Sequence, residues 1–341
     1  MSAISTRPLR APVVDDDFYS FAEHRQRYER VRRVMPAVEW EALYEEVAAI
    51  EALKRKRNAI VLAHNYQRPE IFHGVADVHG DSLALAHLAA ESTADVIVMC
   101  GVHFMAQTAK LLAPDRLVLL PDANAGCSLA NSITAADVRA LRAQHPGVPV
   151  VCYVNTSAEV KAECDACCTS ANAVQVVESL GAPEVIFVPD EYLAAYVAAH
   201  TSVRIISWRG RCEVHERFTA DQIREYRGLT KAYVLAHPEC PVEVQQAADY
   251  VGSTAGMISA LQSARPERAM LITECSMSDN VTSLFPETEF VRPCNLCPHM
   301  QRITLANIRA CLERLAPVVE IPTEIAQRAR RAVEGMLKRA G

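Results

Sequence analysis

Three stretches of this chain share one pattern, GCSLANSITAADVRAL (126–141), RCEVHERFTADQIREY (211–226) and LCPHMQRITLANIRAC (296–311). The cysteine of each stretch stands 85 residues from the next, at Cys127, Cys212 and Cys297. Seven residues after each cysteine, a threonine opens a helix-like segment. A spacing that recurs at the same length indicates an internal repeat. We therefore expect three copies of one structural unit, each bringing one thiol from an equivalent loop.

Between these loops, apolar runs of strand length alternate with helical stretches. Each unit begins with such a run: AIVLAHNY (59–66), PVVCYVNTS (149–157) and AYVLAHPEC (232–240). This alternation is typical of α/β units that build parallel sheets. The expected divisions are an N-terminal helical extension over 1–39, repeats over 40–133, 134–218 and 219–303, and C-terminal helices over 304–341.

Composition and charge restrict the class of protein. The chain has 341 residues, half of them apolar and 22% charged, with a formal charge of −6. This charge argues against a nucleic-acid binder, and runs such as VIVMC (96–100) are too short to cross a bilayer. The N-terminal segment has no continuous apolar region, so no secretory signal is expected. Twelve cysteines in such a chain favour metal binding or catalysis over disulfides. We therefore expect a cytoplasmic protein without membrane or nucleic-acid partners.

The three repeated thiols predict a metal or cluster site that lacks its last protein ligand. Ligation by thiolates alone selects zinc or iron–sulfur among the common metals. A [4Fe–4S] cluster held by three thiolates would leave one iron open to act as a Lewis acid. Two other functions remain open at this point: a non-catalytic iron–sulfur redox protein, and a zinc-dependent lyase or hydrolase using the same thiols.

Polar side chains gather at equivalent places in the three units. The first run of each unit ends in a polar pair: His64 and Tyr66, Tyr153 and Asn155, and His237 and Glu239. Ligands of α/β sheets bind beyond the carboxyl ends of the strands. Each unit then places a hydroxyl near a helix start, at Ser82, Ser170 and Thr254, and His215 follows Cys212 by three residues. A serine or threonine there is usually an N-cap, but its recurrence favours a site for a substrate with several anionic groups.

The chain resembles the quinolinate synthases, iron–sulfur enzymes of de novo NAD biosynthesis, over roughly residues 40–315. The matching segments are AHNYQRPE (63–70), GDSL (80–83), CGVHFMAQTAKLL (100–112), LLPDANAGCSLAN (119–131), YVNTSAEVKA (153–162), CTSANAV (168–174), CEVH (212–215), HPEC (237–240), ADYVGSTAGM (248–257) and CPHMQRITL (297–305). The resemblance implies three pseudo-symmetric αβα domains with parallel sheets around a central active site. It also implies a transferase that condenses iminoaspartate (iminosuccinate) with dihydroxyacetone phosphate to quinolinate, releasing phosphate and water. An aspartate oxidase or dehydrogenase would supply the iminoaspartate.

The resemblance also implies roles for individual residues. Cys127, Cys212 and Cys297 match the ligands of a [4Fe–4S] cluster. The positions that hold the substrates are matched by His64, Ser82, Tyr153, Asn155, Ser170, His237, Glu239 and Thr254. Tyr66 and Glu239 match an acid–base pair, with His215 near the cluster. Some members carry C-x-x-C-x-x-C near the C-terminus, whereas this chain has Val291 at the first position. Cys294 remains, and two alternatives stay open: it pairs with Cys297 under oxidation, which would remove a cluster ligand, or it has no role of its own.

Overall fold

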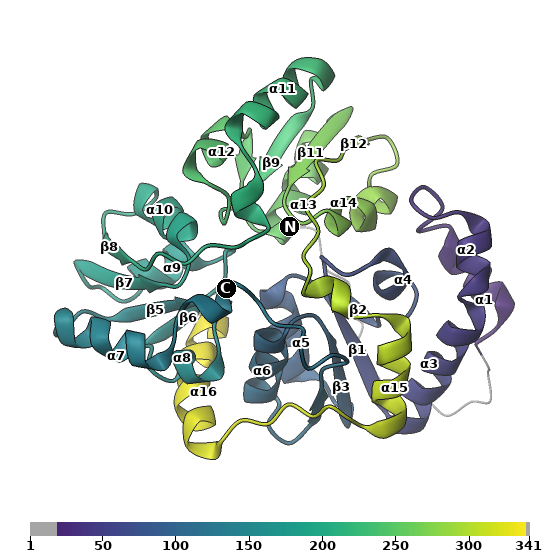
Figure 1. The fold of residues 1–341 in the computed structure, drawn as a ribbon, viewed down its shortest axis with the longest axis horizontal. Coiled ribbons are helices and arrows are strands. Elements are labelled where there is room, and N and C mark those ends of the chain that lie inside the picture. Colours follow the sequence, from purple (N-terminus) through teal and green to yellow (C-terminus); the bar gives the residue numbers. More distant parts are fainter. Residues whose placement is uncertain (1–18, 339–341) are drawn as a thin grey trace.

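The computed structural model describes residues 19–338 and contains three four-stranded sheets arranged around the middle of the molecule (Figure 1). Within each sheet all neighbouring strands are parallel. The three sheets have the same strand order: the second strand of the repeat lies at one edge, followed by the first, the third and the fourth. The strands are β1 (Ala59–His64), β2 (Val78–Gly80), β3 (Val96–Cys100), β4 (Leu117–Leu119), β5 (Val150–Tyr153), β6 (Ala166–Cys168), β7 (Glu184–Val188), β8 (Arg204–Ser207), β9 (Tyr233–Ala236), β10 (Tyr250–Val251), β11 (Arg268–Ile272) and β12 (Glu289–Val291). The predicted α/β class with three pseudo-symmetric αβα domains is confirmed.

Burial explains why the strand runs read as continuous apolar segments. The central strands β1, β3, β5 and β11 are buried along almost their whole length, whereas the edge strand β8 is half-exposed. Helices cover both faces of a parallel sheet, so the middle strands meet apolar neighbours on each side. The first and second repeats share one apolar core, and the third repeat has its own core on each face of its sheet.

The repeated threonines cap three equivalent helices, α7 (Ala135–Gln144), α11 (Ala220–Thr230) and α15 (Leu305–Arg314). In each case the threonine hydroxyl accepts the N–H of the residue three positions later, whose side chain accepts the N–H of the threonine. This reciprocal pair satisfies two backbone donors that the helix itself cannot pair. Helices α7 and α11 lead into the first strands of the second and third repeats, as the expected repeat requires.

Helix α15 is not followed by a strand and returns to the first repeat. It packs along α3 (Tyr44–Arg57), the helix that precedes β1. Two polar contacts fix the pair: Arg309 Nη1 lies 3.0 Å from Glu46 Oε2, and Arg57 Nη2 donates to Glu313 O at 3.1 Å. The start and the end of the repeat array are therefore joined through two helices.

The remaining helices cover the sheets and the outer surface. They are α1 (Phe21–Tyr28), α2 (Ala37–Ala42), α4 (Pro69–Phe72), α5 (Ser82–Glu91), α6 (His103–Leu112), α8 (Ala158–Lys161), α9 (Ala173–Glu178), α10 (Glu191–Ala199), α12 (Val242–Ala247), α13 (Thr254–Ala264), α14 (Ser276–Val281) and α16 (Thr323–Lys338), with short 3-10 turns η1 (Ala130–Ser132), η2 (His215–Arg217), η3 (Thr282–Leu284) and η4 (Met300–Arg302). Among residues 19–338, no helix has both the length and the apolar composition needed to cross a membrane.

The predicted terminal segments are partly described. The extension expected over 1–39 contains α1 and the start of α2, and its first 18 residues lie outside the described part of the chain. The last three residues of the segment expected over 304–341 also lie outside it. Helix α16 lies between the first and second repeats (Figure 1), where Arg330 Nε donates to Leu111 O at 2.7 Å. The exact limits between the repeats remain a prediction.

Candidate active site at the junction of the three repeats

One cavity lies where the three repeats meet. It encloses about 720 Å³, including its opening to solvent. Every residue for which the sequence predicted a catalytic, substrate-binding or metal-binding role lines it: His64, Tyr66, Ser82, Cys127, Tyr153, Asn155, Ser170, Cys212, His215, His237, Glu239, Thr254 and Cys297. These side chains come from all three repeats, so the folded chain gathers in one place what the sequence separates by more than 200 residues. Their individual roles remain predictions.

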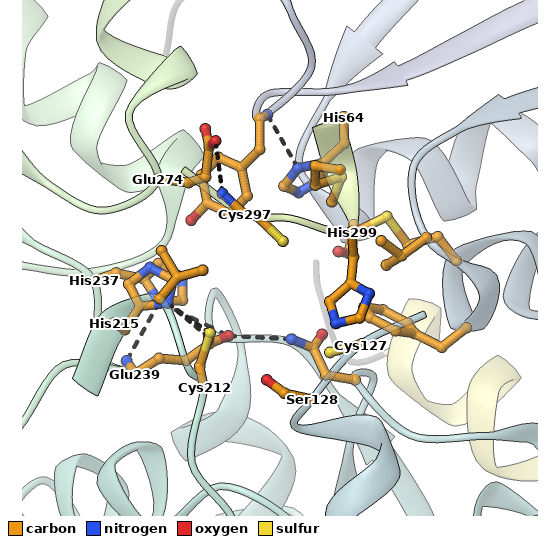
Figure 2. Close-up of a pocket in the computed structure, with 18 of the residues that line it drawn as sticks. His64, Cys127, Ser128, Cys212, His215, His237, Glu239, Glu274, Cys297 and His299 are labelled. Carbon is orange, nitrogen blue, oxygen red and sulfur yellow. Dashed lines mark hydrogen bonds and ion pairs between the residues drawn. The ribbon is translucent and has the colours of Figure 1, made fainter. Parts of the chain in front are cut away.

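The three cysteines occupy equivalent loops after the fourth strand of each repeat. In each loop the cysteine carbonyl accepts the N–H of the residue four positions later, at 3.0 Å for Cys127, 3.0 Å for Cys212 and 3.1 Å for Cys297. This turn precedes the capped helix in all three repeats. Figure 2 shows the three sulfur atoms around the same open space. None of the three forms a disulfide.

The environment of these thiols fits a thiophilic metal group. Burial raises the pKa of Cys127 to about 12, that of Cys297 to about 11, and that of Cys212 well above its ordinary value. The thiols are therefore protonated unless a cation compensates for the charge of the thiolates. Metal binding supplies that compensation and displaces the protons. Three cysteines around one space provide the thiolate donor set of iron–sulfur clusters and of zinc.

Glu239, which follows β9, is the most heavily contacted polar group of the cavity. Its Oε1 accepts Tyr153 Oη at 2.6 Å and Asn155 Nδ2 at 3.2 Å, and its Oε2 lies 3.0 Å from His215 Nδ1. Burial alone would raise the pKa of this carboxyl, but His215 and the hydrogen bonds lower it below its ordinary value overall. Glu239 is therefore an ionised carboxylate at neutral pH, held by side chains from the second repeat.

Two histidines at strand ends have the same local geometry. Nδ1 of His64 accepts the N–H of Tyr66 at 3.2 Å, and Nδ1 of His237 accepts the N–H of Glu239 at 3.3 Å. Burial lowers the pKa of each histidine to about 3, so both imidazoles are neutral at pH 7. With Nδ1 accepting, the proton of the neutral ring lies on Nε2. Each of these two strand-end histidines therefore offers its Nε2–H group as a donor. Nε2 of His237 lies 3.3 Å from Ser170 Oγ.

The hydroxyl residues lie at or near helix starts, as expected. Ser82 is the first residue of α5 and Thr254 is the first residue of α13, whereas Asp81 and Ser253 make the capping hydrogen bonds. The hydroxyls of Ser82 and Thr254 are therefore not used as caps. Thr254 Oγ1 instead accepts Asn65 Nδ2 at 2.8 Å, which links the first repeat to the third. The helix N-terminus adds backbone N–H groups and a partial positive charge beside these side chains.

Two buried polar atoms of the lining have no partner within residues 19–338: Asn155 Oδ1 and His299 Nδ1. Buried polar atoms are normally paired, so unpaired ones in a cavity favour a bound polar ligand. His299 was not singled out from the sequence. It follows Cys297 by two residues, within the matching segment CPHMQRITL, and its Nε2 lies 3.1 Å from Glu213 Oε1.

Thr273 and Glu274 also escaped the sequence analysis. They follow β11, the third strand of the last repeat, whereas only the ends of the first strands had been considered. Glu274 is 1% exposed; its carboxylate accepts Ser276 N at 2.7 Å and Cys297 N at 3.2 Å. Burial raises its pKa to about 7. The sequence does contain a signal for both residues: the apolar run of AMLITE (269–274) ends in a threonine and a glutamate. All strands of a parallel sheet end at the same edge, which is where ligands bind.

The pairing of Cys294 with Cys297, which the sequence left open, is not the one in this structure. Cys294 forms a disulfide with Cys275, and Cys297 remains free in the cavity. The backbone explains the choice of partner: Cys275 N donates to Asn295 O at 3.2 Å, and Glu274 and Asn295 form a parallel bridge. These contacts bring the start of α14 beside Cys294. The disulfide therefore ties down the loop that carries Cys297.

The cavity also contains a mixed group of possible metal ligands. Cys212 Sγ, a ring nitrogen of His215 and a carboxylate oxygen of Glu239 lie within 4.8 Å of one another. His215 Nδ1 is 3.2 Å from Cys212 Sγ. The cavity thus combines thiols, neutral imidazoles, an ionised carboxylate and several hydroxyl and amide donors. This chemistry suits a metal-assisted reaction of a small polyanionic substrate.

Comparison with known proteins gives consistent matches over most of the chain. Residues 48–338 match the model of the family described as Quinolinate synthetase A protein. The chain is 64% identical to Quinolinate synthase 1 of Mesorhizobium japonicum, an alignment that covers 91% of this chain and 96% of that protein. It is 63% identical to Quinolinate synthase of Agrobacterium fabrum (91% and 90% covered) and 60% identical to that of Xylella fastidiosa (86% of each).

Proposed function

The chain belongs to the quinolinate synthetase A family, and we propose that it condenses iminoaspartate with dihydroxyacetone phosphate to form quinolinate, releasing phosphate and water. One observation supports this proposal above the others. Three thiols from equivalent loops line the same cavity as an ionised carboxylate and donors from every repeat. A protein that only carries electrons has no need of such a lining.

The proposed cofactor is a [4Fe–4S] cluster held by Cys127, Cys212 and Cys297. When bound through three thiolates, such a cluster supplies a Lewis-acidic iron with a free coordination position, suited to the removal of a hydroxyl group as water. The burial of the three thiols supports this assignment, because a buried thiolate is stable only beside a compensating cation. The disulfide at Cys294 leaves all three ligands free.

The two substrates carry carboxylates and a phosphate, and the cavity provides donors for these groups. The Nε2–H groups of His64 and His237 donate without carrying charge, since both pKa values are far below 7. Ser82 and Thr254 add hydroxyls beside helix N-termini. Asn155 Oδ1, which has no partner within residues 19–338, is an acceptor for a substrate hydroxyl or N–H group. Donors fixed by three rigid repeats hold two substrates in reactive orientation, which contributes much of the rate.

Glu239 and Tyr66 are the proposed proton carriers. Glu239 is ionised, so its carboxylate accepts a proton during enolisation. Burial raises the pKa of Tyr66 well above 10, so its phenol keeps its proton and donates it during dehydration. Both residues line the cavity, Glu239 from the third repeat and Tyr66 from the first. The opposite directions of the two pKa shifts set the starting protonation states, an ionised carboxylate and a neutral phenol.

The direct test is an anaerobic assay of quinolinate formation by the purified chain. Iminoaspartate is generated in the assay from aspartate by an aspartate oxidase, and dihydroxyacetone phosphate is added. We expect quinolinate and inorganic phosphate in equal amounts, with no quinolinate when either substrate is omitted or when Cys212→Ser replaces the wild type. Failure of an iron- and sulfide-loaded wild type to form quinolinate would refute the proposed reaction.

A further inference from the structure

The three cysteine loops contact one another through residues that lie next to the cysteines. Ser128 and Glu213 directly follow the cysteines of their loops, and His299 comes two residues after the third cysteine. The N–H of Glu213 donates to Ser128 Oγ at 3.2 Å, and its Oε1 lies 3.1 Å from His299 Nε2. We propose that Glu213 and His299 are positioning residues for the metal group, because they fasten the cysteine loops of different repeats together. This inference rests on the proposed function, whose cofactor is the group held.

Further contacts close a ring of loops. The imidazole of His299 lies beside Gly126, which precedes Cys127: a Cβ added to this glycine would lie 3.7 Å from Nδ1 and from Cε1 of the ring (Figure 2 shows His299 beside Cys127). The second and third loops are joined once more, where Asn295 Nδ2 donates to Val214 O at 3.4 Å. Each loop therefore meets both of the others close to its cysteine, and the other two oppose its displacement.

The same loops direct backbone N–H groups at the thiols. The sulfur of Cys297 accepts the N–H groups of Met300 and His299, and the other two cysteines accept those of the residues two and three positions later. Such hydrogen bonds stabilise a thiolate and adjust the reduction potential of an iron–sulfur cluster. Because the backbone of His299 is one of these donors, the contact of its side chain with Glu213 also holds the turn around Cys297.

Glu213 is the one polar partner of the His299 ring within residues 19–338, since Nδ1 is unpaired. A carboxylate only accepts, so Nε2 carries a proton. The side chains of His299 and Glu213 are 25% and 32% exposed, so solvent weakens their contact less than that of a pair on an open surface. Arg217 Nη2 lies 3.9 Å from Glu213 Oε2, but it belongs to the same loop and joins no repeats. The carboxylate of Glu213 therefore sets the direction of the imidazole.

Comparison of the repeats supports a separate role for His299. Its place is taken by Leu129 in the first repeat and by Val214 in the second, and both are buried apolar residues. An apolar side chain would fill the place without needing a partner. Groups that orient metal ligands without touching the metal typically change its affinity by roughly 10- to 100-fold.

Iron release from the loaded protein tests the proposal without the reaction. Glu213→Val removes the acceptor of the His299 ring and keeps the backbone N–H, whereas Glu213→Gln keeps an oxygen that can accept. Glu216→Val is the matched control, because Glu216 is an exposed glutamate of the same loop, outside the cavity lining. With an iron chelator under anaerobic conditions, we expect about tenfold faster release from Glu213→Val and from His299→Leu. Glu213→Gln should lie closer to the wild type, and Glu216→Val should equal it.

A double-mutant cycle shows whether the two side chains act together. The Glu213→Val, His299→Leu double variant should release iron no faster than the faster single variant, because both changes remove the same contact. Accelerations that multiply in the double variant, wild-type release from Glu213→Val, or equal acceleration in Glu216→Val would each overturn the proposal.

Cobalt(II) gives a readout that needs neither the cluster nor the reaction. Co²⁺ bound to thiolates absorbs visible light, so a titration of the metal-free chain measures the affinity of the three-cysteine site. We expect about tenfold weaker binding in Glu213→Val and in His299→Leu, and wild-type affinity in Glu216→Val. Unchanged affinity in the first two would overturn the positioning role, whether or not the wild type makes quinolinate. Weaker cobalt binding in a chain that makes no quinolinate would support that role and count against the proposed reaction alone.

Discussion

At the scale of single residues, burial and local contacts decide which polar groups of the cavity are charged and which are neutral. Glu239 is ionised because His215 and its hydrogen bonds outweigh the effect of burial, whereas His64 and His237 are neutral because burial dominates. The same buried setting thus produces an ionised carboxylate in one place and neutral imidazoles in two others. This division depends on which partners each residue has, and not on its type.

Removal of the proposed base gives the first prediction. Glu239→Gln keeps the size of the side chain but cannot accept a proton, so kcat should fall about 10²- to 10⁴-fold, the usual contribution of an acid–base group. Iron content and the visible absorption of the protein should stay as in the wild type, because Glu239 is not a proposed ligand. Steady-state kinetics and iron analysis on one preparation check both. Normal turnover in this variant would exclude Glu239 as the base.

The cysteines near the C-terminus give a second prediction. Cys294→Ser and Cys275→Ser each break the same disulfide and should both retain iron, because neither residue faces the cavity. Cys297→Ser should lose most of its iron. Iron analysis and thiol titration of the three variants check this. Equal iron loss in Cys294→Ser and Cys297→Ser would mean that Cys294 also holds the metal group.

The sequence predicted the cavity lining well where residues recur between repeats and poorly where they do not. Cys127, Cys212 and Cys297 follow one period, so their convergence could be predicted. Thr273 follows the third strand of the last repeat, and it has no counterpart in the other two repeats. There the third strands are followed by Gly101 and Pro189, which carry no hydroxyl. The Cys275–Cys294 disulfide could not be predicted because an irregular backbone bridge brings its two cysteines together.

At the scale of elements, the capping boxes are the most regular feature of the repeat. Thr134, Thr219 and Thr304 each occupy the same cap position, and the sequence located all three helix starts correctly. The packing of α15 on α3 was not predicted, because an amphipathic helix does not indicate which surface its apolar face will meet. Helix α3 itself directly precedes β1 and packs against it.

A cap substitution tests the contribution of this element. Thr219→Ala removes the side-chain acceptor at the start of α11 and should lower the free energy of unfolding by about 1 kcal/mol. Thr219→Ser should restore it, since the hydroxyl returns. Ser259→Ala is a suitable control, because that exposed hydroxyl only bonds back to Ala255 O within α13. Anaerobic urea unfolding measures all four proteins. A loss in Ser259→Ala equal to that in Thr219→Ala would contradict a specific capping effect.

At the scale of the whole molecule, the junction between the first and third repeats depends on buried polar contacts. Asn280 Nδ2 donates to Asn65 O at 3.0 Å and to Gln67 O at 2.7 Å, and His73 Nε2 lies 3.2 Å from Asn280 O. These contacts position the strand end that carries His64 and Tyr66 against the third repeat. The site therefore exists only when the repeats are assembled.

His73 makes this junction sensitive to acid. Burial, followed by His79, lowers its pKa from 6.5 to about 4, so the unfolded chain takes up a proton at a higher pH than the folded protein does. Its contribution to stability is complete above about pH 6.5 and is lost as the pH falls toward 4. Near pH 5 the loss is about 2 kcal/mol, at roughly 1.4 kcal/mol per pKa unit.

Urea unfolding at pH 7.5 and pH 5 checks this on three proteins. His73→Gln should show a smaller loss of stability on acidification than the wild type, because its amide does not titrate. His200→Gln, which changes an exposed histidine of the second repeat, should behave as the wild type. An identical pH dependence in His73→Gln and the wild type would show that His73 does not sense the acid.

The central claim is that three repeats meet to hold one iron–sulfur cluster through one cysteine each. The most direct measurement is iron and acid-labile sulfide per chain after strictly anaerobic purification, with Cys127→Ser, Cys212→Ser and Cys297→Ser alongside the wild type. We predict about four of each per wild-type chain and a loss of both in every variant. Zinc without sulfide in a properly reconstituted wild type would contradict the claim and assign the three thiols to a different chemistry.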